Sequence, residues 1–567
     1  MNNYSKRVVI IGGAAGGASV AARLRRLDEK AQIVIFEKTS HISYAHCGLP
    51  YFVGGVIEQK ESLLLHTPDS MWKTLRVDVR IRHEVTRILP HKKVVEVKNL
   101  LDGGQFEYPY DTLVVSTGGA SVQPQLPGIG LQQIHTLRNV EDASRLQCLV
   151  STGGVHSAIV VGGGFIGLEM AENLHRKGIA VTLVDQSQQV LPQLDRDMAS
   201  LVHYHMRGHG FKMRLGNGVS GFLQVGSKVQ VMFAEGDSET ADLVILAMGV
   251  RPESHLAKEA GLRVSDDGTI EVDDCMRTSE PHIYALGDVV SVNHRVTGKT
   301  VRIPLAGPAS KQARVVADNI CGRDSRYGGT LGTSVLKLMD MTIATVGINE
   351  QLAKAYGVVY DKTYLSPHSH AGYYPGAKVM YMKVLWSPET MQILGAQIVG
   401  SDGVDKRIDV LSTAMLAGLS VASLKDIDLA YAPPFSSSKD PVNMVGFVAE
   451  NISNGLLFQV FWNKVLSLPR DGSVTLLDVR REAEYKMGHV EGFVNMPLDE
   501  LRDRLGELDT VKPVYVTCQS GLRSYTACRI LQSNGFKCFS IAGGYGLYSK
   551  VVNDMYNQHV SSVKISI

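Results

Sequence analysis

The sequence has almost no net charge, no long apolar run and no leader-like N-terminus. Its 58 lysine and arginine residues nearly balance 56 aspartate and glutamate residues, which argues against nucleic-acid binding or a polybasic membrane surface. No segment approaches the roughly 20 uninterrupted apolar residues of a membrane span. The N-terminal segment lacks the apolar stretch and cleavage site of a signal peptide. We therefore expect a cytoplasmic protein that binds neither nucleic acid nor membrane.

Paired cysteines are also missing. The seven cysteines are scattered and form no CxxC pair and no ligand-like cluster. An odd, scattered set is typical of a reducing compartment with one or two reactive thiols. The histidine pairs His203/His205 and His368/His370 have no companion cysteine or carboxylate in a metal-like spacing. The sequence therefore predicts no metal site.

The length and the element pattern predict several α/β domains. A chain of 567 residues exceeds what one hydrophobic core usually serves. Up to about residue 321, β-branched runs alternate with helical patterns, as in doubly wound sheets; mixed strands follow, and then a second compact α/β pattern. The predicted domains are a Rossmann-like domain in two segments (1–125 and 251–325), a second Rossmann-like domain (126–250), an α+β domain (326–452) and a C-terminal α/β domain (465–555).

A sequence duplication marks two dinucleotide sites. The blocks VVIIGGAAGGASVAARL and AIVVGGGFIGLEMAENL each predict a strand, a glycine-rich turn and a helix. Such a turn brings backbone N–H groups close to a pyrophosphate, and an acid at the end of the next strand binds a ribose. Glu37 and Asp185 occupy that position. The turn residues are Gly12, Gly13, Ala14, Gly16 and Gly17 in the first block and Gly162, Gly164 and Gly167 in the second.

The second block predicts NADH and the first predicts FAD. A carboxylate at position 185 favours a free ribose 2′-hydroxyl over a 2′-phosphate, although an arginine from elsewhere would still allow NADPH. Asp288, in TSEPHIYALGDVV, follows a strand-like run and could bind the flavin ribityl or pyrophosphate region. With LVILAMGVRPE and VVSTGGA, this segment resembles the signature of flavoproteins with two dinucleotide-binding domains, which implies FAD.

The reactive centre is predicted at Cys47, in the segment SYAHCGLPY. Residues 7–450 resemble the coenzyme A-disulfide reductase group of flavin disulfide reductases, in which this segment places one cysteine beside the flavin. The resemblance implies that Cys47 is the nucleophile and redox thiol. Position 52 is Phe, so no CxxxxC pair exists, and the thiol must store its oxidising equivalent as a mixed disulfide, persulfide or sulfenic acid. Helix N–H groups and oxidised flavin would lower the pKa of Cys47.

The same resemblance implies roles for further residues. His46 replaces the family's Asn and could hydrogen-bond to the substrate or protonate a leaving thiolate. Tyr373 or Tyr374, with Tyr431, would reach across a homodimer and donate a hydrogen bond to that thiolate. The residues implied to contact coenzyme A are Ser19, Arg23, Arg26, Ser43, His46 and Lys439. Further cofactor contacts are implied for Lys38, Val85, Gly118, Phe165, Ile166, Glu169, Gly249, Gly287, Leu305 and Ala306.

The C-terminal region carries a second candidate thiol. Cys518 opens the loop Cys518-Gln519-Ser520-Gly521-Leu522-Arg523 after a predicted strand, and residues 470–550 resemble rhodaneses. Backbone N–H groups in such a loop form a nest for anionic sulfur, and Arg523 would add positive charge. We expect Cys518 to carry a persulfide, the alternative being a rhodanese domain used only for binding.

Together these features predict an FAD-dependent NAD(P)H oxidoreductase. Its expected substrates are small sulfur compounds: persulfide, polysulfide, or coenzyme A disulfide or persulfide. Two alternatives remain: an NADH oxidase or peroxidase that uses a Cys47 sulfenic acid, and a redox-sensing or electron-carrier flavoprotein whose rhodanese module docks a partner.

Overall fold

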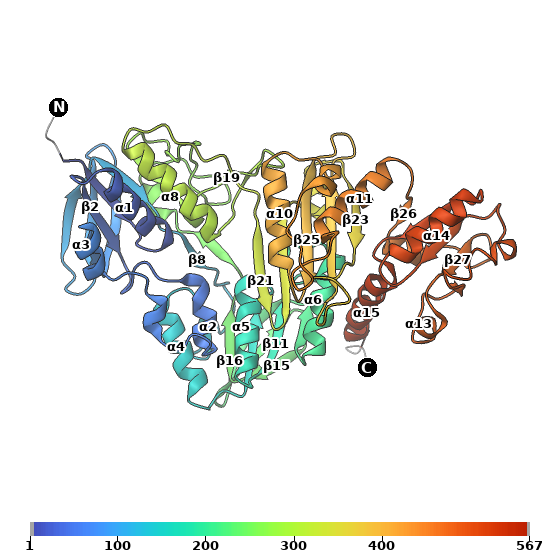
Figure 1. Ribbon diagram of the computed structural model, residues 1–567. Coiled ribbons are helices and arrows are strands. Elements are labelled where there is room, and N and C mark those ends of the chain that lie inside the picture. Colours follow the sequence, from blue (N-terminus) through green and yellow to red (C-terminus); the bar gives the residue numbers. More distant parts are fainter. Residues whose placement is uncertain (1–4, 564–567) are drawn as a thin grey trace. The chain divides into compact units, whose positions relative to one another are not determined.

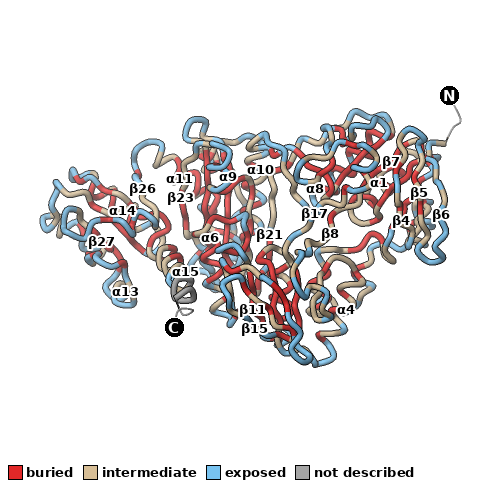
Figure 2. The backbone as a smooth tube through the Cα atoms, turned by 180° about the vertical axis from the view of Figure 1, so that it is seen from behind, coloured by how far each residue is buried: buried red, intermediate tan, exposed pale blue. Residues whose placement is uncertain are grey.

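The computed structural model describes residues 5–563, which divide into two compact units (Figure 1). The first unit holds the residues up to Gln188 together with Lys212–Thr330, and the second holds Gln189–Phe211 together with the residues from Leu331 onward. The backbone of the central strands is buried in both units (Figure 2). Within the described residues, no helix is both long enough and apolar enough to cross a lipid bilayer.

The first unit contains two five-stranded parallel sheets. One has the order β18 (Ile283–Ala285), β7 (Thr112–Val115), β1 (Arg7–Ile11), β2 (Gln32–Glu37) and β3 (Asp78–Ile81). The other has the order β12 (Lys212–Leu215), β11 (Ala180–Asp185), β10 (Ser157–Val161), β16 (Leu243–Leu246) and β9 (Ile134–Thr136). Their central strands β1 and β10 are apolar and buried after the first residue, as expected of parallel strands covered on both faces. This confirms the predicted doubly wound pair, and β18 shows that the chain returns to the first sheet after completing the second.

Helices and small antiparallel sheets complete this unit. The helix after β1 is α1 (Ala15–Leu27), which packs on α8 (Ala306–Ile320), and the helix after β10 is α5 (Phe165–Arg176). A three-stranded sheet contains β4 (His83–Leu89), β5 (Val94–Asn99) and β6 (Gln105–Pro109). Helices α1 and α5 therefore begin at the carboxyl ends of the parallel strands β1 and β10, where dinucleotide sites form.

The second unit begins with an antiparallel sheet of five strands. Its order is β21 (Ser334–Leu338), β22 (Met341–Gly347), β25 (Ile393–Gly400), β24 (Met380–Trp386) and β23 (Asp361–Leu365). The helices α6 (Arg196–Gly208), α10 (Val404–Leu416) and α11 (Pro441–Ser453) belong to the same unit. Buried Lys383 pairs with Asp195 and Asp197, which fixes the start of α6 against this sheet.

The C-terminal part is a five-stranded parallel sheet, as the restarted α/β pattern predicts. The order is β26 (Gln459–Val460), β30 (Cys538–Ile541), β29 (Val514–Thr517), β27 (Thr475–Asp478) and β28 (Val494–Asn495). Its helices include α13 (Glu482–Lys486), α14 (Leu522–Ser533) and α15 (Gly544–Val563).

Buried polar contacts hold this C-terminal part to the rest of the second unit. The buried carboxylate of Asp554, on α15, accepts hydrogen bonds from Ser200, His203 and Arg207 on α6. Trp462 donates its indole N–H to Asp197. Because a buried carboxylate is costly unless its oxygens are paired, these contacts oppose free swinging of the C-terminal domain.

Candidate functional site

The two glycine-rich turns have the same geometry. Gly12 and Gly162 adopt φ of 97° and 114°, in the left-handed region that favours glycine. A Cβ on Gly17 would lie 1.9 Å from the carbonyl oxygen of Gly12, and a Cβ on Gly167 would lie 1.8 Å from that of Gly162. No side chain fits at either position, so the first turn of each helix lies directly against its strand.

The acids at the ends of the next strands also match. The Glu37 carboxylate accepts a hydrogen bond from the Gly13 amide at 2.8 Å, and Asp185 accepts one from the Gly163 amide at 2.6 Å. Each acid is thus held at the mouth of its turn, where a ribose lies when a dinucleotide binds. The geometry fits one dinucleotide at each turn.

Ala14 replaces the middle glycine of the first turn without strain. It is the N-cap of α1 with φ −77° and ψ −150°, and Gly164 is the N-cap of α5 with nearly the same φ, −80°. A Cβ on Gly164 would meet no atom within 4 Å. The position needs neither positive φ nor a missing side chain, which explains why the sequence departs from GxGxxG there.

Other predicted cofactor residues lie at strand ends and turns of the first unit. Gly118, Gly249 and Gly287 all have positive φ. Leu305 is the N-cap of α8, and Ala306 is the first residue of that helix. Phe165 and Ile166 are the first two residues of α5. Val85 is buried in β4. Lys38 forms an ion pair with Glu253 at 2.9 Å, so its ammonium is already paired with a carboxylate.

Asp288 lies in the short 3-10 helix that follows β18, facing Arg138. The nearest distance between its carboxylate and the Arg138 guanidinium is 3.9 Å. Burial raises the pKa of Asp288, and Arg138 and Arg302 oppose that rise. The sequence analysis missed Arg138, because a single arginine before a helix carries no motif.

Cys47 lies in the 3-10 helix η1 (His46–Gly48), immediately before the short helix α2 (Leu49–Val53). The residue is exposed, whereas Phe52, where a second redox cysteine would stand, is buried. Helix α2 packs on α5 of the second sheet: a Cβ on Gly54 would lie 2.2 Å from the Asn173 side-chain oxygen. The single thiol therefore lies beside the helix that starts at the second dinucleotide turn.

The protein groups around Cys47 include two acids that were not predicted. Desolvation by the surrounding protein raises the pKa of the Cys47 thiol, and the carboxylates of Glu169 and Asp288 raise it further. A backbone hydrogen bond at Cys47 itself lowers it. The two acids therefore act against the thiolate, and the predicted lowering of the Cys47 pKa by helix N–H groups together with oxidised flavin stays a prediction.

Glu169, on α5, hydrogen-bonds to Tyr51 on α2. Burial and the neighbouring Glu172 raise the pKa of Glu169 to about 7, which the Tyr51 hydroxyl partly offsets. Burial and Glu169 raise the pKa of Tyr51 to about 12. Glu169 is thus a carboxyl group that titrates near neutral pH at the point where the redox segment meets the second domain.

Replacing Glu169 by glutamine is expected to make Cys47 ionise at lower pH. The carboxylate is negative where a thiol of raised pKa titrates, so its removal lowers that pKa, by a few tenths to about one unit. The pH profile of Cys47 alkylation by iodoacetamide, followed by mass spectrometry, measures the shift. Glu107→Gln, on exposed β6, removes a carboxylate elsewhere and should leave the profile unchanged; an unshifted Glu169→Gln profile would contradict the assignment.

His46 lies against Tyr44, with ring centroids 4.2 Å apart. Burial lowers the pKa of His46 to about 4, with a further contribution from Arg138. The imidazole is therefore neutral at physiological pH. Of the two predicted roles, this favours hydrogen bonding to a substrate over protonation of a leaving thiolate.

The residues predicted to contact coenzyme A are only partly free to do so. Arg23 forms an ion pair with Asp318 of α8 at 2.8 Å, which reduces its value as a phosphate ligand. Arg26 is exposed at the C-terminal end of α1, and Ser19 is half-buried on the same helix. Ser43 is buried with φ 44°, and its amide donates to the Gly13 carbonyl, which ties the redox segment to the first turn.

The structure brings two of the three predicted tyrosines together in the second unit. The hydroxyl groups of Tyr373 and Tyr431 lie 2.8 Å apart, and 76% of Tyr373 is exposed. Tyr374 instead packs its ring edge against His370. Lys439 is exposed in the loop that follows Tyr431. The next residue, Asp440, forms a buried ion pair with Arg407 that holds the end of this loop in place.

Cys518 lies at the end of β29, at the mouth of the loop that leads to α14. Its Sγ accepts a hydrogen bond from the Gly521 amide at 3.1 Å and lies 3.4 Å from the Ser524 hydroxyl. Gly521 has φ 108°, which turns its N–H towards the sulfur. Cys518 is buried, and the Gly521 amide is one of the backbone N–H groups that a nest around the thiol requires.

Arg523 is bound to a carboxylate on α13, and its positive charge also interacts with Cys518. Its two terminal nitrogens bind the Glu484 carboxylate, at 2.7 and 2.6 Å. This bidentate pair lowers the pKa of Glu484 to about 2 and fixes α13 beside the loop. Arg523 thus links α13 to the loop while its charge acts on Cys518, and the sequence could not reveal Glu484 as its partner.

The histidine pairs differ from the prediction in one respect. The His203 ring is buried and hydrogen-bonds to the Val190 amide and to Asp554. The backbone of His368 forms an isolated antiparallel β-bridge with Val379. His205, however, has the companion carboxylate that the sequence pattern lacks, because Asp340 and His209 lie beside it.

The comparisons with known proteins match this architecture. A model described as pyridine nucleotide-disulphide oxidoreductase matches residues 6–313, its dimerisation-domain model matches residues 333–441, and a rhodanese-like domain model matches residues 462–550. A coenzyme A disulfide reductase of Staphylococcus haemolyticus is 35% identical over 448 residues, covering 79% of this chain and all of the relative. The chain belongs to the pyridine nucleotide-disulphide oxidoreductase family.

Two solved structures extend the similarity over nearly the whole chain. The reduced CoADR-RHD of Bacillus anthracis has a TM-score of 0.95 and 44% identity, covering 98% of this chain and 99% of the other. A NAD-dependent persulfide reductase from A. fulgidus has a TM-score of 0.90 and 37% identity, covering 96% and 100%. Family membership implies FAD and NAD(P)H, and the rhodanese-like domain predicted from the Cys518 loop is confirmed.

Proposed function

We propose that this protein uses NADH to reduce sulfur–sulfur bonds at Cys47, with persulfides, polysulfides or coenzyme A disulfide as substrates. One observation carries the proposal: an exposed single thiol lies between the first dinucleotide turn, to which Ser43 is bonded, and helix α5 of the second. The names of the similar proteins, a coenzyme A disulfide reductase and a persulfide reductase, support this substrate class.

Cys47 is proposed to act as a nucleophile. Its thiolate attacks one sulfur of a disulfide; a new S–S bond forms, the original S–S bond breaks, and the other sulfur leaves as a thiolate. With a persulfide, attack on the outer sulfur leaves a persulfide on Cys47 and releases the carrier thiolate. Neutral His46 forms a hydrogen bond with the substrate. It does not transfer a proton to the leaving group.

The residues at the two turns fit FAD and NADH. FAD, when bound, would supply the electron pair from NADH that splits the Cys47 mixed disulfide or persulfide into the Cys47 thiolate and a thiol or hydrogen sulfide. Asp185, held at the mouth of the second turn, accepts hydrogen bonds from a free ribose 2′-hydroxyl and repels a 2′-phosphate. We therefore propose NADH as the preferred reductant.

Coenzyme A is proposed as the thiol carrier. Exposed Arg26 and Lys439 remain available for its phosphates, whereas Arg23 is paired with Asp318. The match to a dimerisation-domain model supports a homodimer, in which the exposed Tyr373–Tyr431 pair would reach the partner's redox centre and donate to a departing thiolate.

The rhodanese domain is proposed to supply sulfane sulfur. The Cys518 thiolate would take the outer sulfur of a donor persulfide and release the donor thiolate, and the Gly521 amide would hold the resulting anion. Because Asp554 and Trp462 fix this domain within the second unit, the pantetheine arm of coenzyme A is the moving element in our proposal.

Anaerobic and aerobic assays of the purified holoprotein test the proposal against its two alternatives. We expect NADH oxidation with coenzyme A persulfide, polysulfide or coenzyme A disulfide under anaerobic conditions, and slower oxidation with NADPH. Turnover with oxygen or peroxide alone would instead support an oxidase or peroxidase. Slow turnover with every small sulfur compound, together with tight binding of one protein partner, would support the redox sensor.

Replacing Cys518 by serine is expected to remove sulfurtransferase activity and leave the reduction of small persulfides intact. The two thiols belong to different units, and Cys518 has a backbone amide directed at its sulfur that would stabilise a transferable persulfide. Thiosulfate-to-cyanide transfer and NADH-dependent persulfide reduction measure the two activities. Cys528→Ser, on the buried side of α14, is the matched control; loss of both activities in Cys518→Ser with bound flavin would contradict separate roles.

A further inference from the structure

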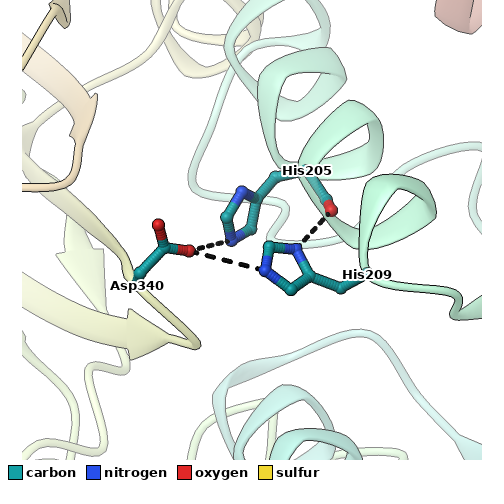
Figure 3. A group of neighbouring side chains, drawn as sticks. All are labelled: His205, His209 and Asp340. Carbon is teal, nitrogen blue, oxygen red and sulfur yellow. Dashed lines mark hydrogen bonds and ion pairs between the residues drawn. The ribbon is translucent and has the colours of Figure 1, made fainter.

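We propose that His205, His209 and Asp340 form a binding site for a divalent transition metal, with Zn²⁺ as the expected ion. Figure 3 shows the two imidazole rings and the carboxylate pointing towards one another. The three ligand atoms lie within 4.8 Å of one another. The site is separate from both thiols, lies wholly within the second unit and does not depend on the proposed function.

The backbone presents the three side chains in a fixed arrangement. His205 and His209 are four residues apart at the C-terminal end of α6, which places them on one face of the helix. Asp340 lies in the two-residue connection between β21 and β22, where the preceding Met339 adopts φ 57°. A tight hairpin turn and the last turn of a helix leave little freedom for the three groups to separate.

The hydrogen bonds leave one lone pair on each ring facing the carboxylate. Nδ1 of His209 bonds to the His205 carbonyl at 3.0 Å, so this nitrogen carries the proton. The His205 ring bonds to the backbone of Leu338, and its Nε2 is shielded from solvent without a hydrogen-bond partner. Metal-binding histidines are commonly fixed in this way, with one N–H on a backbone carbonyl and the other nitrogen free to coordinate.

The distances between the ligand atoms are close to those around one bound ion. Nε2 of His205 is 3.1 Å and Nε2 of His209 is 3.7 Å from the same oxygen, Oδ1 of Asp340. Two ligand atoms, each about 2.0–2.2 Å from one Zn²⁺, lie roughly 3.0–3.6 Å apart at tetrahedral to octahedral angles. Despite this 3.1 Å contact, Nε2 of His205 makes no hydrogen bond.

The donor set selects the metal. Two imidazoles and one carboxylate suit Zn²⁺, and also Ni²⁺ or Cu²⁺, whereas Mg²⁺ and Ca²⁺ prefer oxygen ligands. Asp340 is largely exposed and His205 largely buried, so the ion would enter from the Asp340 side and keep water as its remaining ligand. A bound ion would tie the end of α6 to the β21–β22 turn.

Isothermal titration of the flavin-loaded full chain with Zn²⁺ tests this site. We expect His209→Ala and Asp340→Asn each to bind one Zn²⁺ fewer per chain than the unaltered protein, or to bind that ion at least about tenfold more weakly. All seven cysteines remain in every variant, so binding by thiols is the same throughout. Mg²⁺ should give no difference between the variants and the unaltered protein.

The matched control is His255→Ala. His255 lies four residues before Glu259, 3.4 Å from its carboxylate, in an exposed pair that has no second imidazole. We expect this variant to bind Zn²⁺ like the unaltered protein. Equal stoichiometry and affinity in all four proteins would overturn the proposal. Asp340→Asn changes neither the size nor the backbone of the residue, and its flavin absorbance reports that the chain is folded.

Discussion

Cys47→Ser is expected to lower NADH-dependent reduction of coenzyme A disulfide or persulfide by about 10³-fold or more, because it removes the attacking sulfur. Serine keeps the size of the side chain, and Cys47 is exposed, so the fold and both dinucleotide turns should be unchanged. The expected protein is yellow, binds NADH and is inactive towards sulfur substrates. Steady-state rates and the flavin spectrum measure these properties.

The half-reactions make this result specific. Reduction of the flavin by NADH needs no thiol, so its stopped-flow rate should be preserved in Cys47→Ser while reoxidation by a sulfur substrate is lost. Cys148→Ser, which alters another exposed thiol on a helix of the first unit, should keep both half-reactions. Full turnover of sulfur compounds by flavin-loaded Cys47→Ser would refute the proposed function.

The parts of the fold that repeat a short pattern could be predicted from the sequence. The strands at Val8 and Ala158, the glycine turns and the closing acids are local, and each follows from periodicity and turn chemistry. The lone thiols were also predictable, because Phe52 excludes a pair and the Cys518 loop has a fixed length. The strand order of the two sheets was not predicted, because it depends on pairing between segments that are distant in the sequence.

The partners of the site residues could not be predicted, because they come from distant parts of the chain. Tyr51 hydrogen-bonds to Glu169, and Arg138 faces Asp288. Neither pair has a sequence spacing that identifies it. The acids beside Cys47 and the partner of Arg523 were missed for this reason: Glu169 and Asp288 raise the pKa of the Cys47 thiol, and the Glu484 carboxylate binds the Arg523 guanidinium.

The duplicated turns allow binding of the two cofactors to be disrupted separately. Gly17→Ala places a Cβ 1.9 Å from the Gly12 carbonyl oxygen, and Gly167→Ala places one 1.8 Å from that of Gly162. Overpacking of this kind costs about 1–3 kcal/mol, which weakens binding of the matching dinucleotide about five- to hundredfold. We expect Gly17→Ala to be purified with little flavin, and Gly167→Ala to be yellow with a raised KM for NADH.

Gly164→Ala is the control for both substitutions. It introduces the same methyl group into the second turn, where it meets no atom within 4 Å, and Ala14 already occupies the corresponding position of the first turn. Flavin content and KM for NADH should therefore stay close to those of the unaltered protein. The yellow colour of Gly167→Ala also shows that a backbone clash in one turn leaves the other domain folded. If Gly17→Ala bound a full complement of flavin and only its KM for NADH rose, the assignment of FAD to the first turn and NADH to the second would be reversed.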